Sequence, residues 1–285
     1  MLSKVSLIIP HKDSLKQLNN LLDLMKAWTI YPDEILVVDS SKEKLNISKE
    51  LLKFFDENKI SLQLILGEKL FPGKARNLAI LAAKNPIIAF LDVGTVPTSQ
   101  WLETSLAILE DEDIEGVWGM TKYQANTFTE KLIRASTYGS LPIRTLPGSI
   151  IKKNVFHKVG QFLENVRTGE DSEWMNRIIY LNLVSIDSSV IAVDYYGLLR
   201  LNFKKLVKKW MVSYRSSGGL EYYKWQRQLA IFIALPYIII IAYNWNWLAA
   251  GWQANSLLYI PHVTKIVVMI PLLIYFFYRG IFLPR

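Results

Sequence analysis

The apolar run Ile87-Ile88-Ala89-Phe90-Leu91 ends at Asp92 and is followed by Val93-Gly94-Thr95 rather than by more strand. A carboxylate at the end of a buried strand marks the edge at which a parallel α/β sheet opens onto its ligand. Two other apolar runs end in the same way, residues 5–9 before Pro10-His11-Lys12-Asp13 and residues 34–38 before Asp39. We therefore expect three short strands to bring acidic side chains to one edge of one sheet.

The chain up to residue 195 alternates between strand-like and helix-like stretches. Apolar spacing and Gly or Pro breaks predict helices over residues 15–28, 48–58, 74–83 and 100–109, and further strands over residues 61–66 and 116–123. Alternation at this spacing predicts βαβ crossovers. The fold class is therefore α/β, with a Rossmann-like, mostly parallel sheet that carries helices on both faces.

A second acidic cluster, Gly169-Glu170-Asp171, stands where a helix is expected to begin. Carboxylates at a helix N-terminus are stabilised by the helix dipole, so helix capping alone explains an isolated Glu-Asp pair at this position. A catalytic interpretation of the pair depends on the other motifs of the chain.

Five motifs follow one another in order: residues 5–10, residues 34–39, Gly73-Lys74-Ala75-Arg76-Asn77, residues 88–92 and Gly169-Glu170-Asp171. Together they resemble the family 2 glycosyltransferases, in particular membrane-associated bacterial ones, over residues 4–195. The resemblance implies the GT-A fold and an enzyme that takes a sugar from a nucleotide-sugar donor.

The resemblance also implies roles for residues of this chain. Donor-binding roles fall on Pro10, His11, Asp13, Asp39, Arg76 and Asp92. Pro10 and His11 would border the nucleotide, Asp39 would hydrogen-bond its base or ribose, and Arg76 would face the nucleotide or its pyrophosphate. Asp13 stands where these enzymes commonly have Asn.

Catalytic roles fall on the pair Glu170 and Asp171, with Asp171 as the general base. The chemistry is consistent with this assignment, because the acceptor hydroxyl must lose its proton as it attacks the anomeric carbon. Negative charge meanwhile builds on the departing pyrophosphate, where a divalent cation or an arginine stabilises it. A single displacement of this kind inverts the anomeric configuration.

The metal motif departs from the family pattern. Asp92 would be the first acid of an Asp-x-Asp motif, but Gly94 stands in place of the second, and Tyr195 and Tyr196 occupy the region where a further histidine ligand is often found. Because Mg²⁺ or Mn²⁺ can be held through one carboxylate plus phosphate oxygens, we still expect a divalent metal at Asp92. We also expect the substitution Gly94→Asp to be tolerated.

The net charge of +8 is concentrated in one segment, since eight basic residues and one acidic residue lie between Tyr195 and Gln228. Apolar residues and lysine pairs alternate over residues 201–214, which predicts a helix lying among anionic lipid headgroups. A helix packed on the catalytic domain with a solvated basic face, or a nucleic-acid patch, are the alternatives. The apolar segments that follow favour the membrane, and we expect no nucleic-acid partner.

Two apolar stretches, residues 228–247 and 260–278, are about long enough to cross a bilayer. They predict a C-terminal helical hairpin that is either transmembrane or re-entrant. The expected organisation is thus a GT-A domain over residues 1–195, basic amphipathic interface helices over 196–227 and the hairpin over 228–285. The chain has no cysteine and opens directly on a strand-like run, so we expect neither disulfides nor a signal peptide.

The resulting hypothesis is an inverting glycosyltransferase at the inner membrane with its catalytic domain on the cytoplasmic face. It would transfer sugar to a membrane-associated, polyprenyl-linked or glycan acceptor in cell-surface polysaccharide assembly. One alternative is a polyprenyl-phosphate sugar synthase. Another, of a different class, is a catalytically silent GT-A subunit that serves as a scaffold or binding protein.

Overall fold

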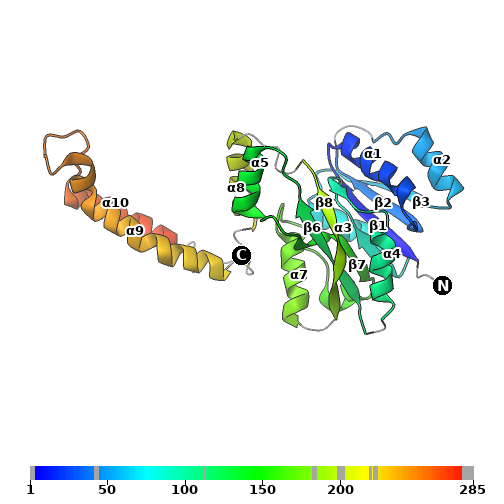
Figure 1. Cartoon of the computed structure of the whole chain (residues 1–285). Helices are drawn as coiled ribbons and strands as arrows, with labels where there is room; N and C mark the ends of the chain where they lie inside the picture. Colours follow the sequence, from blue (N-terminus) through cyan, green and yellow to red (C-terminus); the bar gives the residue numbers. More distant parts are fainter. Residues whose placement is uncertain are drawn as a thin grey trace. The chain divides into compact units, whose positions relative to one another are not determined.

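The computed structural model describes residues 4–41, 45–111, 113–181, 185–197, 203–217, 220 and 224–277. It divides into two compact units, Met1–Trp210 and Met211–Arg285. In Figure 1 the first unit is the α/β body and the second contains the two long helices α9 and α10.

The first unit is built on one sheet. Its strands are β1 (Val5–His11), β2 (Glu34–Asp39), β3 (Ser61–Leu66), β4 (Ile87–Phe90), β5 (Thr95–Val96), β6 (Gly116–Tyr123), β7 (Ile143–Lys152) and β8 (Ile186–Tyr195). Their order across the sheet is β3-β2-β1-β4-β7-β6-β8-β5. The pairs β1–β2, β1–β4, β2–β3 and β6–β8 are parallel, whereas β7 runs antiparallel to both β4 and β6, and β5 runs antiparallel to β8.

Helices cover both faces of this sheet. The helices before α9 are α1 (Leu15–Leu24), α2 (Lys49–Glu57), α3 (Pro72–Ala82), α4 (Trp101–Leu109), α5 (Phe128–Thr137), α6 (Val155–Val159), α7 (Glu170–Leu181) and α8 (Phe203–Ser217), with a 3-10 turn at Met25–Ala27. Of these, α1, α2 and α4 pack on one face of the sheet and α3, α6 and α7 on the other, whereas α5 and α8 share a small core of their own. Successive residues of β1 enter opposite cores: Leu7 and Ile9 pack with α1, α2 and α4, and Ile8 packs with α3, α6 and α7. This alternation is the period-two pattern of a strand that is buried on both faces.

The local sequence determines where several helices begin. Pro72 occupies the first turn of α3, where its missing N–H costs nothing, and the hydroxyl of Ser48 accepts a hydrogen bond from the Leu51 amide at the start of α2 (3.2 Å). At α5, Thr127 and Glu130 form a reciprocal capping box. The expected helices and strands of the first 123 residues are all confirmed within a few residues at their ends.

The second unit contains a helical hairpin of α9 (Lys224–Ala250) and α10 (His262–Phe277). The side chain of Asn246 is fully buried and binds Ile260 twice, through Nδ2 to its carbonyl and through Oδ1 from its amide, both at 2.9 Å. Among the described residues, α9 is the one helix long and apolar enough to cross a bilayer, with a mean hydropathy of 1.7. Leu201 and Tyr278, which bound the predicted segments 201–214 and 260–278, lie outside the described residues.

Candidate active site

The sheet brings the expected strand ends together. In the parallel pair β1–β2, His11 is in register with Asp39, and Asp92 lies just beyond the end of the neighbouring strand β4, with Leu91 between them. The predicted site residues then form two groups. One contains His11, Asp13 and Asp39, and the other contains Arg76, Asp92, Glu170 and Asp171.

The first group is a buried hydrogen-bond network around Asp39. Its Oδ1 atom is 2.9 Å from His11 Nδ1 and accepts bonds from the Ser41 hydroxyl at 2.6 Å and the Ser41 amide at 2.9 Å. Burial raises the pKa of Asp39, but the hydrogen bonds from Ser41 and His11 outweigh it, so the pKa is lowered overall. All three bonds end on Oδ1, and the Oδ2 atom takes no part in them.

The His11 ring connects the end of β1 to Asp39 and to the start of α1. Its Nε2 atom accepts a 3.2 Å bond from the amide of Ser14 at the start of α1, so Nδ1 carries the hydrogen that Asp39 receives. The His11 side chain is only 2% exposed. Both ring nitrogens of His11 already bind neighbouring residues, and its expected place beside the nucleotide stays a prediction. Ser41, which the sequence interpretation did not assign to the site, completes the network and also accepts from the Asp13 amide at 2.7 Å.

In the second group, Arg76 is clamped between two carboxylates. Its Nη1 atom donates to Glu170 Oε1 at 2.6 Å and its Nη2 atom to Asp92 Oδ1 at 3.3 Å. The Arg76 and Glu170 side chains are each 5% exposed, whereas Asp92 is 31% exposed. Arg76 is thus buried beneath the carboxylates and positions them. This differs from the expected role, in which its guanidinium faces the nucleotide.

The motif Gly73-Lys74-Ala75-Arg76-Asn77 explains how Arg76 is held there. A β-carbon at Gly73 would stand 2.1 Å from the Leu163 carbonyl oxygen, so only glycine allows α3 to approach this loop. Asn77 then binds the loop backbone in both directions, to the Phe162 carbonyl at 2.9 Å and from its amide at 3.0 Å. Arg76 also lies over the Phe162 ring, 5.8 Å from its centre.

Negative charge exceeds positive charge in this group. Burial raises the pKa values of Asp92 and Glu170; the Arg76 guanidinium opposes both shifts, and the nearby Asp171 charge adds to them. The Oε2 atom of Glu170 is buried and has no hydrogen-bond partner among the residues that the structure describes. Capping therefore does not account for Glu170, since its carboxylate binds an arginine from another helix.

The position of the missing second acid is filled by an aromatic ring. A β-carbon at Gly94 would stand 2.7 Å from Cε1 of Tyr195 and 3.2 Å from the Tyr196 carbonyl oxygen. Gly94→Asp therefore requires the Tyr195 ring to move, which argues against the expectation that this substitution is tolerated. Within the described residues, no group of three acidic or histidine side chains is placed to hold a metal, so Asp92 would have to bind a cation with help from the donor's phosphates.

Tyr195 belongs to a row of three stacked tyrosines. Its ring lies 5.5 Å from that of Tyr123, which in turn lies 4.0 Å from that of Tyr138. Burial raises the pKa values of all three phenols, and the charges of Asp92 or Asp171 raise each further, so the hydroxyls stay protonated and can donate hydrogen bonds. The sequence interpretation missed this row because its members come from three distant segments.

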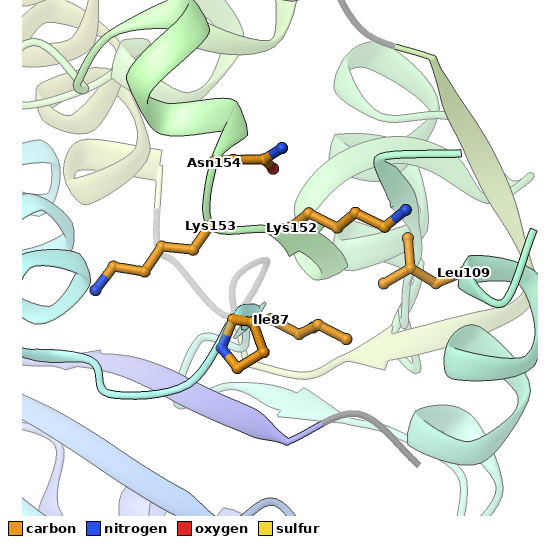
Figure 2. A pocket seen from close by; sticks show the side chains of 6 residues that line it. Ile87, Leu109, Lys152, Lys153 and Asn154 are labelled. Atoms are coloured by element: carbon orange, nitrogen blue, oxygen red, sulfur yellow. The ribbon is translucent and has the colours of Figure 1, made fainter. Parts of the chain in front are cut away.

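A pocket of about 330 Å³ lies elsewhere on the sheet (Figure 2). It is lined by Pro86, Ile87, Leu109, Lys152, Lys153 and Asn154. Ile87 begins β4, so the pocket is at the opposite end of this strand from Asp92. None of its lining residues is acidic, and the amine of Lys153 donates to the Ala83 carbonyl at 2.6 Å. The acidic edge is the better candidate for chemistry.

Solved structures share this fold. The mannosyltransferase PcManGT from Pyrobaculum calidifontis, solved with GDP-Man and Mn²⁺, is 17% identical, with a TM-score of 0.51 over 98% of this chain and 83% of that one. S. aureus TarS 1-349 with UDP-GlcNAc is 20% identical, with a TM-score of 0.50 over 67% of this chain and 58% of that one. A mixed α/β sheet with this arrangement and an acidic cluster at its edge defines a GT-A domain.

The sequence comparisons identify the family. The family described as Glycosyl transferase family 2 matches residues 6–163, more than half of the chain, and the chain belongs to this family. A curated relative, the glycosyltransferase AglE of Haloferax volcanii, is 27% identical over 189 residues, which are 61% of this chain. The chain spans about 60% of the length of that relative.

Proposed function

We propose that the protein is an inverting, nucleotide-sugar-dependent glycosyltransferase whose acceptor is held at a membrane. The observation that carries the proposal is the Arg76 clamp, which fixes Asp92 and Glu170 beside Asp171 at the edge where the strands end. Family membership supports the reaction class. The domain assignment, residues 1–195 for catalysis and the rest for membrane attachment, is part of the same proposal.

In this proposal the donor lies across the two groups of side chains. Asp39, whose Oδ2 atom the internal bonds leave unused, hydrogen-bonds the base or ribose, with Pro10 and Asp13 beside it. Asp92 lies at the diphosphate and is the most exposed carboxylate of the Arg76 clamp. Arg76 acts as a positioning residue that holds Asp92 in place.

The excess of carboxylates over cations around Asp92 fits a divalent cation, Mg²⁺ or Mn²⁺, bound by Asp92 together with the donor's phosphates. Such a cation supplies positive charge that stabilises the departing diphosphate. Burial and the Asp92 charge raise the pKa of Tyr195, so its phenol stays protonated and is available as a hydrogen-bond donor next to Asp92.

Transfer requires a base on the acceptor side. The Asp171 carboxylate takes the proton of the acceptor hydroxyl while that oxygen bonds to the anomeric carbon, and the bond between this carbon and the diphosphate oxygen breaks. Inversion follows from attack opposite the leaving group. Ser172 supports Asp171 by donating its amide hydrogen to Oδ1 at 2.7 Å.

The membrane-linked acceptor is supported by the C-terminal part of the chain. The helix α9 is long and apolar enough to cross a bilayer, and α8 carries lysines but no acidic residue. Two acceptors are consistent with these two helices. One is a polyprenyl-linked sugar in cell-surface polysaccharide assembly, and the other is the polyprenyl phosphate used by a lipid-phosphate sugar synthase. Anionic headgroups of the inner membrane's cytoplasmic face are the proposed lipid contact.

A donor panel tests the proposal. Purified full-length protein in detergent is incubated with individual nucleotide sugars, with and without chelator, and nucleoside diphosphate release is measured. Nucleoside diphosphate release that occurs with one particular donor and is lost when Asp171 is substituted supports the enzymatic function. Binding of a nucleotide sugar without release, under all metal conditions and with added polyprenyl phosphate, identifies a silent binding subunit instead.

A further inference from the structure

The helix α5 exposes an apolar face on the surface of the first unit. Phe128 is 83% exposed and Leu132 is 60% exposed, and their spacing of four residues puts them on the same side of the helix. The opposite side of α5 is buried, with Glu130 at 8% and Ile133 at 7%. The exposed side of α5 faces away from the core, so core packing does not require Phe128 or Leu132 at these positions.

The first turns of α8 pack on the buried side of α5. Leu206 forms a small core with Ile133 and Ala125, and the two helices lie next to each other in Figure 1. The packed alternative for residues 201–214 is thus partly correct. Lys204 and Lys208 are exposed, as is Trp210 at 44%, whereas Lys209 is half-buried and burial lowers its pKa.

We propose that the exposed side of α5, with Phe128, Lys131 and Leu132, is a lipid-docking surface for an anionic bilayer, and that Lys204 and Lys208 of the adjacent helix α8 add electrostatic attraction. Charge complementarity favours this occupant: α8 has no acidic residue, and the one acid of α5, Glu130, is buried in its capping box. Lysines beside exposed aromatic and aliphatic side chains are the composition of a surface that rests at headgroup level. The apolar α9 that follows α8 in the chain would keep this surface near a bilayer.

The docking surface is connected to the candidate active site through the end of α5. Tyr138 caps this helix, with its amide bonded to the Arg134 carbonyl at 3.0 Å, and stacks on Tyr123 at 4.0 Å. Tyr123 stacks in turn on Tyr195, which covers Gly94 beside Asp92. Docking of α5 would therefore fix the height of the acidic cluster above the headgroups, where a lipid-linked acceptor presents its reactive end. This last step rests on the proposed function, whereas the docking itself does not.

Site-specific labelling of the full chain tests the docking surface directly. The chain has no cysteine, so Phe128→Cys and Leu132→Cys give unique labels for an environment-sensitive fluorophore. The matched control is Leu81→Cys on α3, which has a comparable exposure of 68%. Each variant is reconstituted in nanodiscs that contain lipids with nitroxide groups at defined depths.

Labels at positions 128 and 132 should be quenched by shallow nitroxides, at about 5–10 Å below the headgroups, and the label at 81 should not. Quenching at 128 should fall in neutral lipid, in high salt and in the triple variant Lys131→Gln/Lys204→Gln/Lys208→Gln. Equal quenching at 128, 132 and 81, or none at any of them, would overturn the proposal. Cysteine cross-linking through position 128 in detergent, together with a lack of lipid quenching, would identify a second copy of the chain as the occupant instead.

The link between docking and catalysis is tested by a separate experiment. Phe128→Ser/Leu132→Ser should lower transfer to a bilayer-embedded lipid acceptor several-fold while leaving donor hydrolysis in detergent unchanged. Unchanged transfer in the bilayer would refute the link. If the wild-type protein hydrolyses no donor, the proposed function fails, and the quenching result still decides whether the surface docks on lipid.

Discussion

The ring of Tyr195 occupies the space that a side chain at Gly94 would need, with its Cε1 atom 2.7 Å from the position of a β-carbon. An aspartate introduced there cannot act as a second metal ligand unless the tyrosine moves. The amide of Tyr196 also donates to the Gly94 carbonyl at 3.0 Å, and the pairing of β5 with β8 begins at the next residue with Thr95 opposite Tyr195, so the tyrosine backbone is held in place.

We predict that Gly94→Asp destabilises the fold by about 1–3 kcal/mol, the usual cost of overpacking, and lowers donor turnover. In a Tyr195→Ala background, where the ring is absent, Gly94→Asp should cost much less stability than it does in the wild-type background. Denaturant unfolding in detergent measures both effects. Equal stability of Gly94→Asp and wild type would show that the ring is free to move aside.

Arg76→Met should be among the most destabilising single substitutions in the first unit. It leaves the buried Glu170 carboxylate without its partner, and breaking a buried ion pair costs about 3–5 kcal/mol. The double variant Arg76→Met/Glu170→Met should be more stable than Arg76→Met alone. The control is Lys53→Ala in the exposed pair Lys53–Glu57, which should change the free energy of unfolding by about 1 kcal/mol or less.

Asp171→Asn should reduce transfer by about 10²–10⁴-fold, the usual contribution of a general base, while nucleotide binding stays close to wild type. Glu173→Gln is the matched control, because Glu173 lies in the same helical turn but pairs with Arg177 at 2.6 Å. Steady-state transfer and donor binding are measured for both. Full activity in Asp171→Asn would remove this residue from the mechanism.

Stability at acid pH should depend on Asp39. The pKa of Asp39 is lowered in the folded protein, so its contribution is present above the ordinary pKa of 3.8 and is lost as the pH falls through the folded value. Ser41→Ala removes a hydroxyl donor to Oδ1, so the free energy of unfolding should depend less steeply on pH below about 4. The free energy of unfolding of wild type and Ser41→Ala, measured as a function of pH, checks this prediction. The same pH dependence below about 4 in both proteins would contradict it.

The topology of the hairpin can be tested by labelling. Leu257 is fully exposed in the connection between α9 and α10, and residues 244–264 contain no lysine or arginine, which predicts that this connection faces outward. Leu257→Cys should react with an impermeant reagent in intact cells, and Glu57→Cys on α2 should not. Labelling of Leu257→Cys only after lysis would indicate a re-entrant hairpin.

The strands that end at the site could be predicted from the sequence because their signal is local. Each of β1, β2 and β4 is an apolar run closed by a polar residue, and the helices between them have clear periodicity. The helix α5 also had a local signal, since Thr127 and Glu130 have the spacing of a capping box, but the sequence interpretation did not use it.

The burial of His11 and Arg76 could not be predicted in this way. A motif indicates that a residue lies near the site, but burial depends on contacts from distant segments, such as Glu170 for Arg76 and Asp39 and Ser41 for His11. The row of stacked tyrosines could not be predicted for the same reason, because Tyr123, Tyr138 and Tyr195 meet only after β6, α5 and β8 have assembled.

The position of β7 in the sheet has a consequence for the growing chain. This strand, Ile143–Lys152, is inserted between β4 and β6, although β4 is made more than fifty residues earlier. Until the ribosome has delivered β7, the buried residues Ile88 and Ala89 of β4 have an open strand edge, which is prone to pair with other chains. Fragments that stop before residue 143 should therefore aggregate, and expression trials of the catalytic domain should retain the chain beyond β8.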